Sequence, residues 1–184
     1  MKNFYVIGLG ASAGGLPALI DFFKHTTENP NVAFVVVTHL TRGYRSQMDM
    51  ILAKYSIAPV IRVTENMRVV PGHVYVLAEN RTMTIQDGIL QVELRDPSPQ
   101  NWSVDIFLNA LACDFKEKSV GIIFSGGGDD GTLGAEAITS EGGKVMVQDP
   151  GTAAVQSMPV SVIRYDHPVA VMEPAALAGL INRM

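Results

Sequence analysis

The stretch Phe4-Tyr5-Val6-Ile7-Gly8-Leu9-Gly10-Ala11-Ser12-Ala13-Gly14 joins an apolar run to a glycine-rich turn. The apolar run predicts a β-strand, and residues 16–25 predict the helix that follows the turn. Residues 10–14 match the pattern G-x-S-x-G. A serine between two glycines at a strand-to-helix turn is typical of a nucleophile, because the tight turn exposes the hydroxyl and lets a substrate approach. Ser12 is therefore a candidate nucleophile.

The same stretch also fits a second pattern. Gly8, Gly10 and Ala13 match the dinucleotide-binding fingerprint G-x-G-x-x-G/A. Such a site needs an Asp or Glu about 20 residues further on, at the end of the second strand, to bind the ribose hydroxyls. The next apolar run, residues 32–37, ends in Thr38-His39-Leu40 and has no carboxylate there. The sequence thus favours an esterase-type hydrolase, with a dinucleotide-binding Rossmann-type oxidoreductase as the alternative.

His39 and a second glycine-rich loop supply candidate partners for Ser12. The carboxyl ends of neighbouring parallel strands share one crevice, so Ser12 and His39 can face each other there as nucleophile and general base. The loop Ser125-Gly126-Gly127-Gly128-Asp129-Asp130-Gly131 follows a third apolar run. Its two carboxylates would repel a phosphate, and adjacent carboxylates rarely point the same way toward a metal. An aspartate that orients the His39 imidazole fits better.

Apolar runs and helical patterns alternate along the chain. Helices are expected at 16–25, 46–54, 103–115, 132–140 and 174–183, with Ser103 as the N-cap of the third. Asp87-Gly88 between two runs of alternating polarity predicts an antiparallel hairpin at an edge of the sheet. The expected fold class is α/β, with a doubly wound, mostly parallel sheet, helices on both faces and an antiparallel hairpin insert.

Composition limits the class of protein. The 184 residues suit one domain, and we expect residues 1–184 to form it. A net charge of −4 without a Lys/Arg cluster argues against nucleic acid as a partner. One cysteine, Cys113, leaves no internal disulfide. Because no signal peptide and no apolar run of membrane-spanning length is present, we expect a cytoplasmic protein without membrane insertion.

Six short motifs occur in order along nearly the whole chain and resemble the catalytic domain of CheB, the chemotaxis receptor protein-glutamate methylesterase. They are Gly10-Ala-Ser-Ala-Gly-Gly15, Val36-Val-Thr-His39-Leu, Pro71-Gly-His-Val-Tyr75, Ser103-Val-Asp105, Ser125-Gly-Gly-Gly-Asp-Asp-Gly131, and Gln148-Asp149 followed by Met158-Pro159. The resemblance implies a serine hydrolase that demethylates γ-glutamyl methyl esters and releases methanol, with glutamine deamidation as a related activity.

Carried over by position, the resemblance makes Ser12 the nucleophile, His39 the base and Asp130 the orienting acid. Asp129 falls where the family usually has Asn or Ser. Ala13 replaces a common threonine and Gly127 a common methionine, but their backbone N–H groups remain available for an oxyanion hole. This chemistry requires no cofactor and no metal.

The resemblance also implies the partners. The substrate would be the cytoplasmic helices of methyl-accepting chemotaxis receptors or of a similar sensor protein, with a methyltransferase or a regulatory domain as further members of the system. Arg42 and Arg45, just past His39, are candidates for substrate docking because receptor helices are acidic. We expect no receiver domain within this chain. A receptor-docking module that keeps the fold without catalysis is a further alternative.

Two residues near the motifs are assigned by pattern alone. Asp105 is interpreted as an exposed helix residue, with a role in the pocket as the alternative that the resemblance suggests. Trp102 fits a wall of the cleft and the core equally well.

Overall fold

A parallel seven-stranded sheet forms the centre of the computed structural model, which describes residues 3–40, 43–98 and 100–184. In spatial order the strands are β10 (Ala170–Met172), β9 (Lys144–Gln148), β8 (Ser119–Ile123), β1 (Tyr5–Ala11), β2 (Val32–Thr38), β5 (Val74–Leu77) and β3 (Val60–Val63). Every neighbouring pair in this sheet is parallel. β1 lies between β2 and β8, so the chain winds outward from it in both directions.

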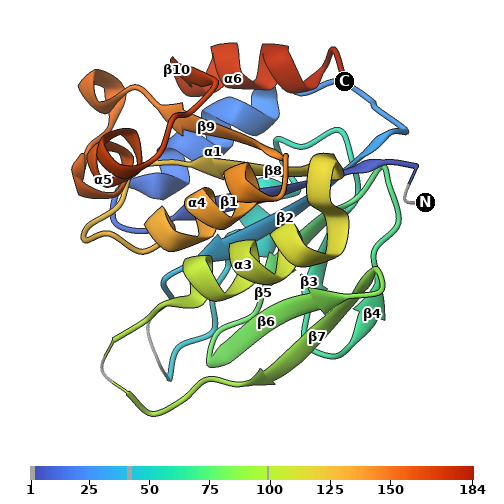
Figure 1. The fold of residues 1–184 in the computed structure, drawn as a ribbon. Coiled ribbons are helices and arrows are strands. Elements are labelled where there is room, and N and C mark those ends of the chain that lie inside the picture. The colour runs from blue at the N-terminus through green and yellow to red at the C-terminus, as the bar shows by residue number, and fades with distance from the viewer. Residues whose placement is uncertain (1–2, 41–42, 99) are drawn as a thin grey trace.

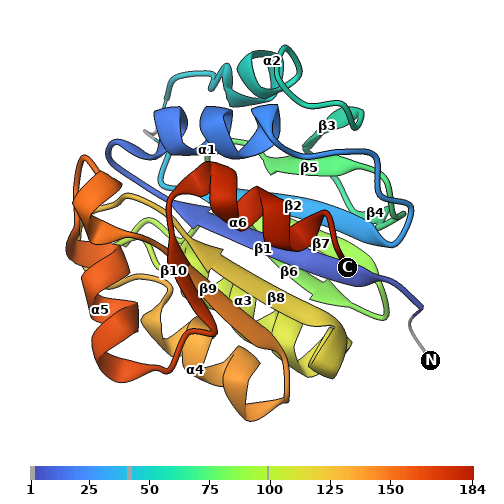
Figure 2. The ribbon, with the colours of Figure 1, turned by 90° about the horizontal axis from the view of Figure 1, so that it is seen from above.

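Helices cover both faces of the sheet. One face carries α1 (Gly15–Lys24), α2 (Met48–Leu52) and α6 (Pro174–Ile181), which lie toward the viewer in Figure 2. The other carries α3 (Ser103–Phe115), α4 (Thr132–Ser140) and α5 (Ser157–Tyr165) (Figure 1). Two 3₁₀ turns, Lys116–Lys118 and Pro150–Thr152, complete the helical elements of the described residues. The doubly wound α/β fold predicted from the sequence is confirmed.

Because helices cover both faces of the sheet, the side chains on both faces of its central strands are mostly apolar. All seven residues of β2 are buried, as expected for a parallel strand enclosed between two helical layers. On the α1 face, the ring of Phe22 packs edge-on against those of Phe34 and Phe124 at centroid distances of 6.0 and 5.6 Å. Such aromatic pairs contribute roughly 0.5–1.5 kcal/mol each beyond area burial. This core fixes the sheet from which the loops of the site emerge.

Gly8 and Gly10 lie inside β1 rather than in the turn after it. A Cβ on Gly8 would come within 2.6 Å of Leu108 Cδ2, and one on Gly10 within 2.5 Å of Val104 Cγ1. The missing side chains therefore let α3 approach β1 closely. Close helix packing accounts for both glycines, and this placement does not favour a dinucleotide cradle. It also brings the start of α3 to the carboxyl end of β1.

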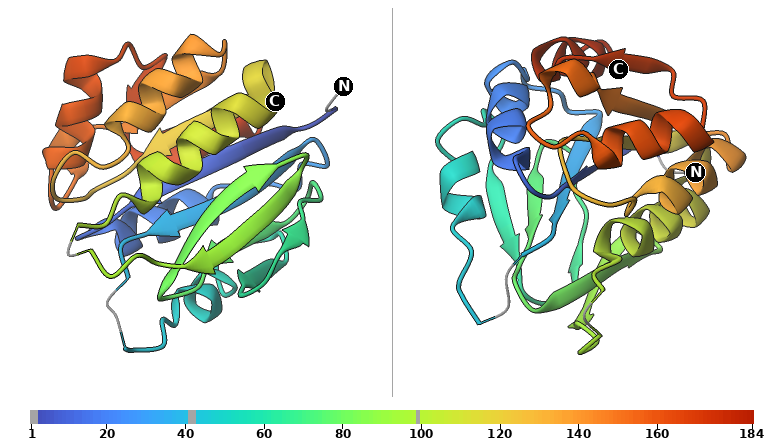
Figure 3. Two further views of the ribbon diagram at one scale, coloured as in Figure 1. Left: turned by 60° about the horizontal axis from the view of Figure 1, so that its bottom comes forward. Right: turned by 90° about the vertical axis from the view of Figure 1, so that its left-hand side faces the viewer.

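The hairpin lies in a separate sheet, so the prediction that it borders the main sheet is wrong. β7 (Ile89–Leu94) pairs with β6 (Arg81–Gln86) on one side and with β4 (Met67–Arg68) on the other, in an antiparallel sheet of their own. The buried side chains of Met83 and Leu90 belong to the core that α3 covers, and Figure 3 (left) shows the hairpin against that helix. Burial of this apolar face under α3 decides its place, whereas alternating polarity specifies only that one face is buried.

Several boundaries and elements differ from expectation. α5, β10 and β4 have no counterpart in the sequence prediction, and the helices expected at 46–54 and 174–183 are shorter. Trp102, not Ser103, is the N-cap of α3, and its side chain makes no capping bond. Within the described ranges, no helix is long and apolar enough to cross a membrane.

Candidate active site

Three loops meet at the carboxyl ends of β1, β2 and β8, on the left in Figure 1. Ala11 pairs with Thr38 in the strand register, so Ser12 and His39 each stand one residue beyond that pair. Hydrogen bonds tie these loops together: Ser12 N–H donates to Ser125 O at 3.0 Å, and His39 N–H donates to the O of Ala11, at the end of β1, at 3.4 Å. The parallel sheet thus brings three segments distant in sequence to one edge.

His39 and Asp130 are in direct contact. Nε2 of His39 lies 2.5 Å from Oδ2 of Asp130, and the two side chains are 21% and 3% exposed. A carboxylate accepts the Nε2 proton, which leaves Nδ1 of the neutral ring as the basic nitrogen. Asp129 is exposed at the surface of the same loop. The structure thus brings Asp130, rather than its neighbour, to the imidazole.

The start of α3 holds the Asp130 carboxylate. Its Oδ2 accepts from Val104 N–H at 3.0 Å and its Oδ1 from Asp105 N–H at 2.8 Å. Two of the unpaired N–H groups of the helix are thereby satisfied by a side chain from another loop, and the positive end of the helix favours the charge. Asp130 thus satisfies the helix N–H groups that the sequence prediction assigned to Ser103 as an N-cap. The N–H of Ser103 itself donates to Asn101 Oδ1.

Asp105 is buried, so its interpretation as an exposed helix residue is wrong. It is 6% exposed, and its Oδ1 accepts from Gly131 N–H at 2.9 Å and Gly134 N–H at 2.7 Å. Burial, together with the negative charge of Asp130, raises the pKa of Asp105 to about 6. The sequence pattern of the helix did not predict that Asp105 is buried, because α4, which covers the first turn of α3, is distant in sequence.

The Ser12 turn is tightly constrained. Gly14, at a φ of 71°, is the N-cap of α1, and Gly15 N–H donates to Ser12 O at 2.9 Å. On the facing loop, a Cβ on Gly126 would lie 3.0 Å from Ser12 Cβ and 2.1 Å from Met158 Sδ. The absence of a side chain at Gly126 therefore lets both Ser12 and Met158 pack closely against the loop.

Two backbone N–H groups beside Ser12 remain available. Ser12 N–H and Gly126 N–H donate to Ser125 O and Val155 O, both at 3.0 Å. Across the part of the chain that the structure describes, Ala13 N–H and Gly127 N–H donate to no acceptor. Backbone N–H groups that have no acceptor and lie near a serine hydroxyl are suited to stabilise an oxyanion, and Ala13 also lies at the turn that opens α1.

A cleft of about 140 Å³ opens beside His39 and Asp130. Its lining residues are His39, Gln100, Asn101, Trp102, Gly127, Gly128, Asp129 and Asp130. Trp102 is 40% exposed and forms a wall of this cleft, which decides between the two roles left open for it. Over the described ranges, no group of three or more His, Cys, Asp or Glu side chains converges in a way that would hold a metal ion.

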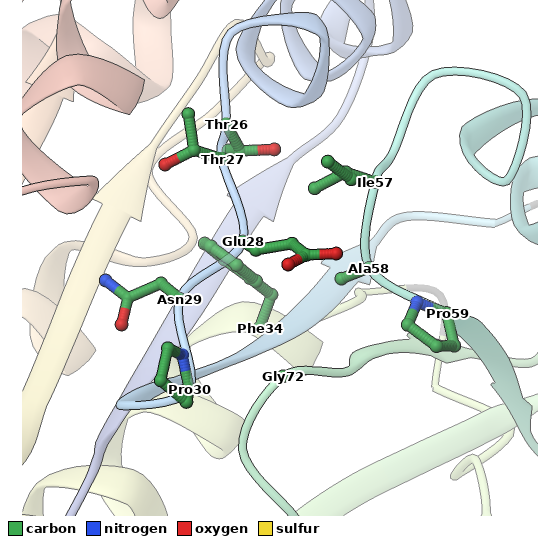
Figure 4. Close-up of a pocket in the computed structure, with 10 residues that line it drawn as sticks. All are labelled: Thr26, Thr27, Glu28, Asn29, Pro30, Phe34, Ile57, Ala58, Pro59 and Gly72. Carbon is green, nitrogen blue, oxygen red and sulfur yellow. The ribbon is translucent and has the colours of Figure 1, made fainter.

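A larger cavity, of about 310 Å³, lies near the opposite ends of the strands (Figure 4). Phe34, Ile57 and Pro59 give it apolar walls, and Glu28 is the titratable side chain among its lining residues. It contains neither a histidine nor a cysteine to pair with a nucleophile. Size alone therefore does not identify the site, and the cleft at His39 is the better candidate.

The comparison with known families agrees with this geometry. A model of the CheB methylesterase family matches residues 7–181. The chain belongs to the CheB methylesterase family. The crystal structure of the Thermotoga maritima CheB methylesterase catalytic domain is similar, with a TM-score of 0.87, 27% identity and 98% of each chain covered. The family resemblance inferred from the sequence motifs is confirmed.

Curated CheB-family relatives carry the name protein-glutamate methylesterase/protein-glutamine glutaminase. One from Carboxydothermus hydrogenoformans is 31% identical over 180 residues, which is 94% of this chain and 53% of the relative. Another from Myxococcus xanthus is 31% identical over 157 residues, which is 84% of this chain and 43% of the relative. The chain spans about half the length of the curated relatives it matches.

The segment after the CheB-family histidine carries the basic residues proposed for docking. Arg42 lies outside the described residues, and Arg45 is exposed between β2 and α2. Next to it, Ser46 N–H donates to Glu79 Oε2 at 3.1 Å, which anchors the far end of this segment. Arg95, which the motifs did not indicate, donates through Nη1 to Leu40 O at 3.3 Å. A second cation therefore lies next to the His39 loop.

Proposed function

We propose that this chain is a protein-glutamate methylesterase that uses Ser12, His39 and Asp130. The contact between His39 and Asp130, made beside the Ser12 turn, carries the proposal. A buried carboxylate then lies behind an imidazole whose second nitrogen has no hydrogen-bond partner among the described residues, as a nucleophilic serine requires. Family membership supports the same chemistry, since the curated relatives bear the name protein-glutamate methylesterase/protein-glutamine glutaminase.

The mechanism begins with attack of Ser12 Oγ on the carbonyl carbon of a glutamyl methyl ester. His39 takes the hydroxyl proton on Nδ1, while Asp130 holds the ring and stabilises the imidazolium. The N–H groups of Ala13 and Gly127 donate to the oxyanion. As the intermediate collapses, the C–O bond breaks, and the imidazolium returns the proton to the departing methoxide, which leaves as methanol.

Water then hydrolyses the acyl-enzyme. His39 removes a proton from the attacking water and returns it to Ser12 Oγ as the acyl C–O bond breaks, which frees the glutamate carboxylate. Glutamine deamidation follows the same path with ammonia as the leaving group. Every proton transfer uses His39, so these steps need no metal ion or cofactor.

The proposed substrate is the methylated cytoplasmic helices of a chemotaxis receptor or similar sensor, so we place the protein in the cytoplasm. These helices are acidic, and this chain is itself net negative, at −4. A local basic surface near the cleft, with Arg45 and Arg42, would offset that repulsion at the docking site. A methyltransferase acting on the same glutamates belongs to the proposed system, and a regulatory domain is a further proposed partner.

Methanol release from a methylated receptor fragment tests the proposal directly. Ser12→Ala should lower kcat on the order of 10³-fold or more, because it removes the nucleophile. His39→Ala should do the same, and the double variant should be little worse, because the two residues act as one unit. Ser140→Ala, at an exposed position late in α4, is the control and should keep wild-type turnover.

Two results would contradict this function. Full turnover by Ser12→Ala would exclude Ser12 as the nucleophile. Normal receptor binding by the wild type with no methanol release would instead identify a docking module without catalysis.

A further inference from the structure

The carboxylates of Asp105 and Asp130 each accept hydrogen bonds from backbone N–H groups at the start of the helix that begins near the other aspartate. Asp130, from the loop before α4, accepts N–H bonds from Val104 and Asp105 at the start of α3. Asp105, from the first turn of α3, accepts N–H bonds from Gly131 and Gly134 at the start of α4. Each carboxylate therefore offsets the positive end of the helix at whose start the other aspartate lies. Displacement of either one would disturb both helix starts.

This arrangement makes the position of Asp130 depend on Asp105. Gly131, whose N–H donates to Asp105 at 2.9 Å, directly follows Asp130 in the chain. Gly131 has a φ of 100° and is the N-cap of α4, so its hydrogen bond to Asp105 holds the backbone directly after Asp130. The imidazole contacts Oδ2 of Asp130 and the Asp105 N–H binds Oδ1, and Asp105 is not among the residues that line the cleft.

We propose, building on the function proposed above, that Asp105 is a positioning residue of the esterase site: its carboxylate fixes the loop that carries Asp130 and places a second negative charge behind His39. The charge acts through Asp130. Both anions stabilise the imidazolium that forms when Ser12 loses its proton, because this region is buried and poorly screened.

Among the described residues, Asp130 is the charged group that acts on the pKa of Asp105. Asp130 faces it from the loop before α4, and His39 reaches the pair from the end of β2. Its hydrogen-bond partners on Gly131 and Gly134 are backbone amides, which do not titrate. Because burial and Asp130 raise the pKa of Asp105 to about 6, its charge is present at neutral pH and is lost as the pH falls through that value.

The substitution Asp105→Asn separates charge from support. The amide keeps an oxygen that can accept from Gly131 and Gly134 but removes the negative charge. We expect kcat for methanol release to fall about tenfold at pH 8. The acid limb of the kcat/KM profile should move to lower pH, because the variant lacks one of the two negative charges that stabilise the imidazolium. The ratio of wild-type to variant turnover should shrink as the pH falls below about 6, where the wild type loses the same charge.

Asp114 provides the matched control on the same helix. Its carboxylate accepts from Asp87 N–H at 2.9 Å and Gly88 N–H at 3.0 Å, at the hairpin turn far from the cleft. Asp114→Asn therefore makes the same chemical change at another pair of amides. It should leave the acid limb at its wild-type position. Asp105→Glu, which keeps the charge, should stay closer to the wild-type profile than Asp105→Asn.

An NMR titration of the imidazoles tests the charge without relying on turnover. The His39 resonance is the one, among four histidines, that disappears in His39→Gln. Its midpoint should move to lower pH in Asp105→Asn by roughly half a unit or more. An unchanged midpoint and acid limb in a folded Asp105→Asn would overturn the role of Asp105. Absence of methanol release from the wild type would instead overturn the proposed function, while the titration would still decide the role of Asp105.

Discussion

At the scale of single residues, the site depends on which of two adjacent aspartates points inward. Asp129 and Asp130 have the same side chain, but Asp129 is exposed and Asp130 is 3% exposed. The difference comes from the partners of Asp130, which are the His39 ring and two N–H groups of α3. Neighbouring loop residues project in different directions, so at most one of the pair can serve the imidazole.

Asparagine substitutions should therefore separate the two aspartates. Asp130→Asn should lower kcat roughly 10⁴-fold, because an amide favours the wrong imidazole tautomer. It should also cost about 1 kcal/mol of stability through the weakened cap of α3. Asp129→Asn should change kcat less than about threefold. Steady-state kinetics on the methylated fragment, with thermal melts as a check on folding, measure both effects. A larger loss at Asp129 would mean that the loop register is wrong by one residue.

At the scale of elements, α5 clamps the loop that faces Ser12. Met158 N–H donates to Gly126 O and Gly126 N–H to Val155 O, both at 3.0 Å. The buried Met158 side chain then packs where a Cβ of residue 126 would lie. The available amide of Gly127 is consequently held next to the serine by an element that the sequence prediction did not contain.

Gly126→Ala should loosen this clamp. Its Cβ would lie 2.1 Å from Met158 Sδ and 3.0 Å from Ser12 Cβ, so the loop must move away from the serine. We expect a loss of about 1–3 kcal/mol in unfolding free energy, as for other overpacked positions, and at least a tenfold fall in kcat. Gly179→Ala, in α6 with no atom within 4 Å of the new Cβ, is the control. Wild-type kinetics in Gly126→Ala would show that the loop position does not limit catalysis.

Elements with a strong local signal were predictable. α3 ends at Phe115 as predicted, and it begins at Ser103, the residue predicted as its N-cap. The placement of the hairpin and the burial of Asp105 could not be predicted from local sequence. The hairpin packs against α3 and Asp105 against α4, and both helices are distant in sequence from these partners. α5 and β10 follow glycine- and proline-containing turns, and β10 has three residues, too few for an alternating pattern to appear.

At the scale of the whole molecule, the proposed catalytic residues and the proposed docking residue Arg45 lie at the same end of the sheet. The loops after β1, β2 and β8 carry Ser12, His39 and Asp130, and Arg45 follows in the loop after β2. The overall charge is −4, so an acidic partner would be repelled by the protein as a whole and attracted only by a local basic surface. Binding that depends on such a surface is sensitive to salt and to charge reversal.

Charge reversal of Arg42 and Arg45 together should raise KM for the methylated receptor fragment about tenfold, with kcat for a small methyl ester unchanged. The matched control is Arg183→Glu, next to Asn182, whose side chain contacts Thr27 and His25 at the other end of the sheet. It reverses one charge rather than two, away from the cleft, so an effect of net charge alone would appear in this protein as well, at about half the size in free energy. An equal fall in small-ester hydrolysis in the Arg42/Arg45 protein would place these arginines in catalysis or folding, and docking would then need another surface, with Arg95 beside Leu40 as the next candidate.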